Sequence, residues 1–185
     1  MRFVTIFAML LANVSAQTLY YFVSPFLSTR AAAILRRNGT GEALGTIQFN
    51  QALLYGPVTL AGTLVGLEGP VHGFTIHQHG DMTHGCNSSG GHFNPDRSNH
   101  GANTDLIRHV GDLGNVQVDA KGMATISLVD PVITLHGRNN IIGRSLVVHA
   151  YPDDLGKGGN AESLISGNSG PGVACGVIGL VSEIP

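Results

Sequence analysis

Residues 58–77 read VTLAGTLVGLEGPVHGFTIH and contain two short β-rich runs with a turn between them. The first run spans residues 58–67, the second spans residues 71–77, and Gly69-Pro70 lies between them. Runs of β-branched and aromatic residues bounded by Gly and Pro are typical of strands. The stretch therefore predicts two successive strands, and it shows no convincing helical periodicity.

Six further runs of this kind occur along the chain, at 31–35, 43–49, 116–118, 124–128, 146–148 and 173–181. The sequence of 185 residues also carries 26 glycines without a collagen-like period, which is typical of a fold with many tight turns. We therefore predict one all-β domain, an eight-stranded antiparallel sandwich or barrel.

The N-terminus has the pattern of a secretory signal peptide. Arg2 precedes the apolar run 3–11, and Val14-Ser15-Ala16 has the small residues of a cleavage site. We predict a signal peptide over 1–16, a short lead-in over 17–30 and the folded domain over 31–185. An uncleaved anchor or a buried strand is the alternative interpretation of the first segment.

Composition and cysteine content agree with secretion into an extracellular, oxidising compartment. Cys86 and Cys175 are the two cysteines, and they are interpreted either as a disulfide pair or as two buried thiols. Asn38-Gly39-Thr40 and Asn87-Ser88-Ser89 are candidate glycosylation sites at Asn38 and Asn87. The net charge is −2 without a run of Lys or Arg, so neither nucleic acid nor a membrane surface is indicated as a partner.

Two long segments, about 79–110 and 151–171, lack strand character, and loops of that length are usually functional. The first segment contains five of the nine histidines. His92, His100 and His109, together with Asp112 just beyond it, supply the nitrogen and oxygen donors of a tetrahedral zinc site. The alternative is a set of solvated loop histidines.

Several motifs resemble the copper/zinc superoxide dismutase family, and they cover about residues 31–182 in the family order. They include GPVHGF at 69–74, GHFNP at 91–95, HVGDLGN at 109–115, IIGRSLVVH at 141–149, DDLGKGGN at 153–160 and ACGVIG at 174–179. The resemblance implies a Greek-key arrangement of the eight strands with two long functional loops.

The resemblance also implies the roles of the site residues. The zinc ligands would be His92, His100, His109 and Asp112, and His92 would bridge to a copper ion held also by His77 and His149. Asp153 would connect a zinc histidine to a copper histidine from outside both metal shells. Cys86 and Cys175 would form the family disulfide.

Three positions depart from the family pattern, and all three concern copper or superoxide. Thr75 stands where the first copper histidine is expected, so Asp153 would lose one of its two histidine partners. Gly172 replaces the arginine that holds the superoxide anion, and Ile165 replaces a guiding lysine. His79 is on the same strand face as His77 and is an alternative copper ligand, although it is displaced by roughly 6–7 Å.

These departures predict a secreted, superoxide dismutase-like protein that binds zinc, with weakened copper binding and with dismutation weak or lost. We assign no catalytic residue. Two alternatives stay open, namely a competent superoxide dismutase with a rearranged copper site and a non-catalytic binding protein on the same scaffold. A homodimer is compatible with Gly80, Ile142-Gly143 and Val177.

Overall fold

The computed structural model describes residues 28–52 and 56–182. The predicted signal peptide, residues 1–16, and most of the lead-in, residues 17–30, lie outside the described residues. Strand β1 (Thr29–Arg37) begins two residues before the predicted start of the domain. Within the described ranges, no helix is long and apolar enough to cross a membrane.

Eight antiparallel strands make up the wall of a nearly closed barrel, as far as the structure describes the chain. They are β1, β2 (Ala43–Gln51), β3 (Val58–Val65), β4 (Val71–His77), β6 (Asp112–Gln117), β7 (Met123–Asp130), β8 (Ser145–His149) and β9 (Gly172–Val177). Four shorter elements are also present, namely β5 (Thr83–Cys86), η2 (Asn87–Ser89), α3 (Ser163–Ser166) and β10 (Gly179–Leu180). The predicted all-β, eight-stranded fold is confirmed.

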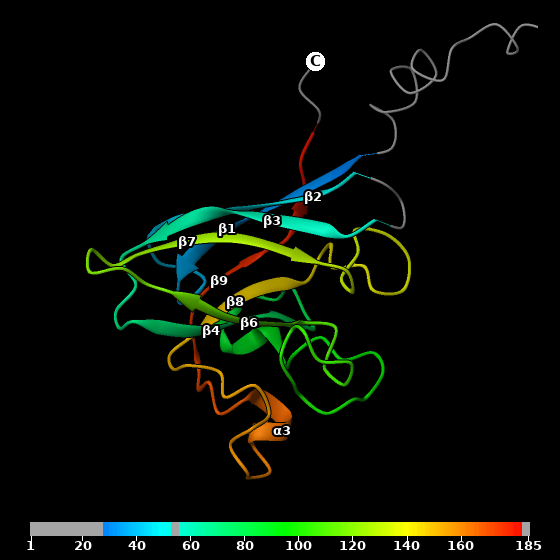
Figure 1. Ribbon diagram of the computed structural model, residues 1–185. Helices are drawn as coiled ribbons and strands as arrows, with labels where there is room; N and C mark the ends of the chain where they lie inside the picture. Colours follow the sequence, from blue (N-terminus) through cyan, green and yellow to red (C-terminus); the bar gives the residue numbers. More distant parts are fainter. Residues whose placement is uncertain (1–27, 53–55, 183–185) are drawn as a thin grey trace, which may run out of the picture.

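The strand order is β6-β4-β8-β9-β1-β2-β3-β7, with β10 paired to β1. Figure 1 shows β1, β2, β3 and β7 as one layer, with β4, β6 and β8 in a second layer below it. Because β3 and β4 follow each other in the chain but are far apart in this order, the chain crosses between layers, as in a Greek key. The end strands β6 and β7 contact each other, which nearly closes the barrel.

Three details of the predicted strands are wrong. Strand β6 begins at Asp112 rather than at residue 116, and the run 173–181 is divided into β9 and β10. The segment 79–110 contains β5, which the sequence pattern does not reveal. Four residues are too few for a periodic signal, and β5 is held in place by the disulfide at its last residue.

Strand β4 is buried on both faces, and this property places the histidine sites. Its residues alternate between faces, so Phe74 and Ile76 enter the apolar core while Thr75 and His77 point the other way. The long loop after β5 pairs with the edge of β4, where Phe93 donates its N–H to the Ile76 carbonyl at 2.8 Å and His92 lies opposite His77. The side chains of Thr75 and His77 are both buried. The polar face of β4 is therefore enclosed rather than exposed to solvent.

A disulfide joins Cys86 at the end of β5 to Cys175 in β9, across 89 residues of sequence. It fixes the start of the histidine-rich loop to the barrel wall. Both cysteines are buried, with 4% and 0% of their surface exposed.

We expect the double variant Cys86→Ala/Cys175→Ala to lose about 2–5 kcal/mol of unfolding free energy, because its unfolded chain is no longer constrained. Urea unfolding of both proteins under non-reducing conditions measures the difference. Unfolding the wild-type chain with a reductant present is the matched control and should give the same loss. Equal stability of all three samples would contradict the expectation.

Candidate metal centre

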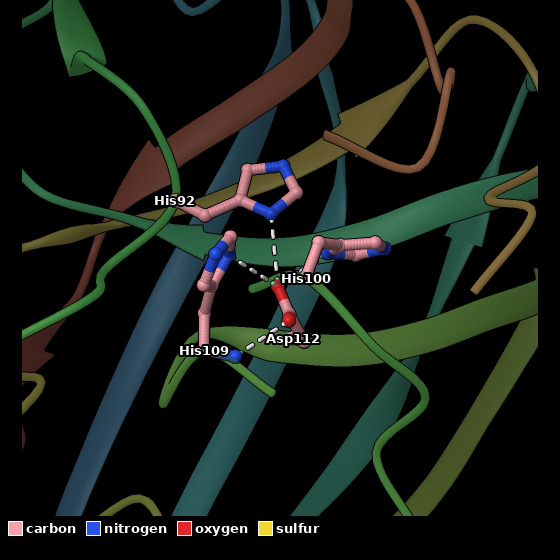
Figure 2. Close-up of side chains that lie close together, drawn as sticks. All are labelled: His92, His100, His109 and Asp112. Atoms are coloured by element: carbon pink, nitrogen blue, oxygen red, sulfur yellow. Dashed lines mark hydrogen bonds and ion pairs between the residues drawn. The ribbon is translucent and has the colours of Figure 1, made fainter. Parts of the chain in front are cut away.

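Four buried side chains converge at the first histidine-rich site. The Asp112 Oδ1 atom lies 2.9 Å from His92 Nδ1, 2.9 Å from His100 Nδ1 and 3.1 Å from His109 Nδ1. Figure 2 shows the three imidazoles arranged around the carboxylate. Asp112 comes from the first residue of β6, while the histidines come from the loop before it. The four donors lie close enough together to hold one metal ion.

The outer hydrogen bonds orient two of these imidazoles. His100 Nε2 donates to Asp153 Oδ1 at 2.7 Å, and His109 Nε2 donates to the Ser98 carbonyl at 3.0 Å. Each ring therefore turns its Nδ1 inward, toward Asp112. The Nδ1 atoms of His100 and His109 are buried and have no hydrogen-bond partner among the described residues. Zinc prefers such a set of imidazole nitrogen and carboxylate oxygen, and the residues fit that ion.

The imidazoles of His92, His100 and His109 and the Asp112 carboxylate form a cage, and its electrostatics favour a positive charge inside it. Burial by itself raises the pKa of Asp112, but the imidazoles of His100, His109 and His92 that surround the carboxylate hold that pKa well below its usual range. Burial lowers the pKa of His100, and the carboxylates of Asp112 and Asp153 outweigh it and raise the pKa to about 9. Without metal, a proton on His100 supplies the charge that a divalent cation would supply.

Arg108 and Asp130 support the cage, and the sequence pattern did not reveal them. The Arg108 guanidinium donates to the Asp112 carbonyl at 2.5 Å and pairs with Asp130 at 2.7 Å. Both side chains are at least 97% buried. Asp130 ends β7, so only the folded barrel brings it beside the loop. The position of Arg108 beside His109, a candidate ligand, is the feature of the sequence that could have indicated its supporting role.

We expect Asp130→Ala to cost about 3–5 kcal/mol of unfolding free energy, because it leaves the buried Arg108 charge without its partner. Thermal unfolding at fixed zinc concentration measures this loss. Arg138→Ala is the matched control, since Arg138 pairs with Asp96 at 2.6 Å on the surface, where a pair contributes about 0–1 kcal/mol. Equal effects of the two substitutions would contradict a supporting role for the buried pair.

A second group of imidazoles lies beside the first and shares His92. His77, His92 and His149 are also close enough to hold a metal ion. His77 Nδ1 donates to the Gly90 carbonyl and His149 Nδ1 donates to the Gly170 carbonyl, each at 2.7 Å. Their Nε2 atoms therefore carry lone pairs, and these two atoms are 3.2 Å apart. His92 Nε2 is buried without a partner among the described residues.

Burial keeps His77 and His149 of this second group neutral. Burial and then the nearby His92 and His149 lower the pKa of His77 to about 3. The pKa of His149 falls to about 4, mainly through burial. The second group therefore differs from the first, which contains a carboxylate and favours positive charge.

Thr75 occupies a position beside this group and changes its donor set. Its side chain is completely buried, and its hydroxyl donates to His149 Nε2 at 2.8 Å. That bond uses the lone pair which a metal ion would need. Asp153 Oδ2, on the far side, is buried and has no partner in the part of the chain that the structure describes. With threonine instead of histidine at position 75, Asp153 was expected to lose one of its two histidine partners. Its unpaired Oδ2 atom agrees with that expectation.

The second group does not fit divalent copper well. Copper(II) favours a tetragonal set of nitrogen and oxygen ligands, and three imidazoles leave that set one donor short. His79 does not join the group among the described residues; its side chain is exposed and lies over Gly90.

A channel of about 750 Å³ leads from the surface to the second group. Its walls include Tyr151, Leu164 and Ile165, which have 60%, 43% and 61% of their surface exposed. Among the described residues that line it, there is no Lys or Arg. Ile165 lies at this mouth, where the family resemblance implies a guiding lysine. The channel has no side-chain cation to attract a small anion.

Gly172 is packed too tightly to be replaced by a longer residue without rearrangement. A Cβ atom there would lie 2.8 Å from both Cys86 Cβ and Val147 Cγ1. An arginine at this position therefore requires movement of the disulfide or of β8. The glycosylation candidates Asn38 and Asn87 are both exposed.

The structure is thus an eight-stranded β-barrel with two adjoining candidate metal sites that share one imidazole. The family model for copper/zinc superoxide dismutase (SODC) matches residues 43–178. The chain is also similar to the superoxide dismutase [Cu-Zn] of Yarrowia lipolytica, at 49% identity over 154 residues, 83% of this chain and 99% of that protein. The chain belongs to the copper/zinc superoxide dismutase family.

Proposed function

We propose that this chain is a secreted, zinc-binding member of the superoxide dismutase family in which superoxide dismutation is weak or lost. The observation that carries the proposal is the bond from the Thr75 hydroxyl to His149 Nε2. At position 75 a neutral hydroxyl replaces an imidazole nitrogen that could bind copper. It also uses the lone pair of a second such nitrogen, His149 Nε2. Zinc binding is retained, because the cage around Asp112 keeps four converging donors.

In this function His92, His100, His109 and Asp112 hold zinc, and the zinc orders the loop over β4. Copper, when bound in a member of this family, supplies the redox chemistry that converts superoxide to O2 and H2O2. This chain offers copper only His77, His92 and His149, so bound copper would be weakly held. The channel lacks a cation among its described lining residues, and focused charge raises encounter rates by about 10–10³.

The extracellular location rests on the signal-peptide pattern over 1–16, and the Cys86–Cys175 disulfide agrees with it. Glycans on Asn38 and Asn87 belong to the same proposal. A homodimer through Gly80, Ile142-Gly143 and Val177 is also part of the proposal. These residues form one patch within the chain, since a Cβ atom at Gly80 would lie 2.3 Å from the Gly143 carbonyl and 3.2 Å from Val177. Val177 is 42% exposed and available to a second copy.

The dismutation rate of the chain after loading with copper and zinc tests the proposal. The Yarrowia lipolytica relative, loaded and assayed in the same way, provides the reference. We expect a rate at least about tenfold lower, since loss of electrostatic guidance alone accounts for that factor. An equal rate would establish the alternative of a competent enzyme with a rearranged copper site.

A non-catalytic binding protein is the second candidate. It is favoured by the exposed apolar side chains at the channel mouth, Tyr151, Leu164 and Ile165. Exposed apolar residues around a concave site are typical of binding surfaces.

A further inference from the structure

We propose that the channel above His77 and His92 binds a small, uncharged, apolar molecule that carries one hydroxyl group, such as a phenol. This inference rests on the proposed function, because it requires the second histidine group to be free of copper. The proposed ligand is neutral and would bind in the channel through which superoxide, a small anion, would reach copper in an active member of the family.

The walls of the channel are suited to an apolar ligand. Tyr151, Leu164, Ile165 and Pro171 form the apolar part of its lining, and its volume of about 750 Å³ is within the range of small-molecule sites. The lining also contains uncharged polar side chains, namely Asn94, Ser98, Asn99, Ser166 and Asn168. Apart from the histidines, Glu162 is the charged residue among the described residues that line the channel. An anionic ligand would meet this carboxylate without a Lys or Arg to offset it.

The polar floor of the channel is suited to a hydroxyl group. His77 Nδ1 donates to the Gly90 carbonyl, so His77 Nε2 accepts a hydrogen bond. The nearest ring nitrogen, His149 Nε2, is also an acceptor and already receives the Thr75 hydroxyl at 2.8 Å. His77 Nε2 therefore lacks a donor of its own, although 93% of the residue surface is buried. Buried acceptors without a donor are costly, and a ligand O–H would relieve that cost.

His92 provides the complementary donor. In the metal-free chain His92 Nδ1 donates to Asp112, but when zinc is bound at this Nδ1 the neutral ring carries its proton on Nε2. This Nε2 atom is buried and has no partner among the residues that the structure describes. A hydroxyl can donate to His77 and accept from His92 at once. A protonated amine only donates, and ketones and carboxylates only accept, so each satisfies one of the two.

The zinc-loaded, copper-free full chain should be titrated with 4-methylphenol, toluene and benzoate while the histidine Cε1–H resonances are followed by NMR. We expect saturable shifts of the His77 and His92 signals with 4-methylphenol. Toluene, which cannot make the two hydrogen bonds, should bind at least about fivefold more weakly. Benzoate should also bind more weakly, because the described lining offers it no Lys or Arg.

Ile165→Lys and Leu106→Lys form a matched pair of variants. Leu106 is fully exposed on the zinc loop and is not among the residues that line the channel. Ile165→Lys should weaken 4-methylphenol binding about fivefold and favour benzoate, whereas Leu106→Lys should change neither. The absence of saturable binding, equal binding of toluene, or equal effects of the two lysines would each overturn the inference. Fast dismutation by the copper-loaded chain would instead overturn the proposed function, so the two failures are distinguishable.

Discussion

The Asp112→Ala variant should bind no zinc in the cage and should unfold at a much lower temperature than the wild-type chain. Removing the carboxylate takes away the only anionic donor of the four and leaves three buried imidazoles facing one another. Apparent zinc-binding free energies of about 10–16 kcal/mol are known for structural sites, so we expect a loss of at least about 4 kcal/mol. For a domain of this size that corresponds to a decrease in Tm of about 8–16 °C.

Calorimetry at equal zinc concentrations, with zinc content measured for each sample, checks this expectation. Asp96→Ala is a suitable control, because Asp96 lies in the same loop but makes an exposed pair with Arg138. That substitution should change stability by less than about 1 kcal/mol and leave zinc bound. An Asp112→Ala variant that keeps its zinc and its Tm would show that the cage is not a zinc site.

The Thr75→His variant should gain copper binding. It restores a fourth nitrogen donor, frees His149 Nε2 from the Thr75 hydroxyl, and provides a partner for the unpaired Asp153 Oδ2. Outer-sphere partners alone change metal affinity by about 10–100-fold, so we expect copper to bind at least about 100-fold more tightly. Dismutation should appear with it, although the channel still lacks a guiding cation.

Competition against a copper chelator measures the affinity, and the copper signal in electron paramagnetic resonance reports the ligand set. Thr75→Val is the matched control, since it removes the hydroxyl without adding a donor. The single substitution at position 75 is preferable to one that also changes Gly172, because a side chain at 172 would contact the disulfide. Equal copper affinity of the His and Val variants would contradict the interpretation of Thr75.

Much of the fold could be predicted because its strands carry strong local patterns. Alternation in β2 and β7, with Ile47 and Phe49 buried and polar neighbours exposed, is visible in the sequence. The candidate zinc ligands could be proposed because three of them lie in one loop and Asp112 directly follows it. Strand β5 and the early start of β6 were missed, since contacts with distant segments determine them.

The finer features of the site depend on contacts across the barrel. The sequence pattern identifies Thr75 as an unusual residue, but only the pairing of β4 with β8 brings its hydroxyl to His149. Likewise, Arg108 and Asp130 are 22 positions apart and meet only in the folded chain. The tight packing around Gly172 arises from the disulfide, which a linear motif does not describe.

Anomalous diffraction at the zinc and copper absorption edges, from crystals grown with both metals present, tests whether zinc fills the first site while the second site stays without copper. We expect a full zinc peak among His92, His100, His109 and Asp112, with little or no copper signal beside His77 and His149. A strong copper peak there, held by these histidines and a fourth donor, would contradict it.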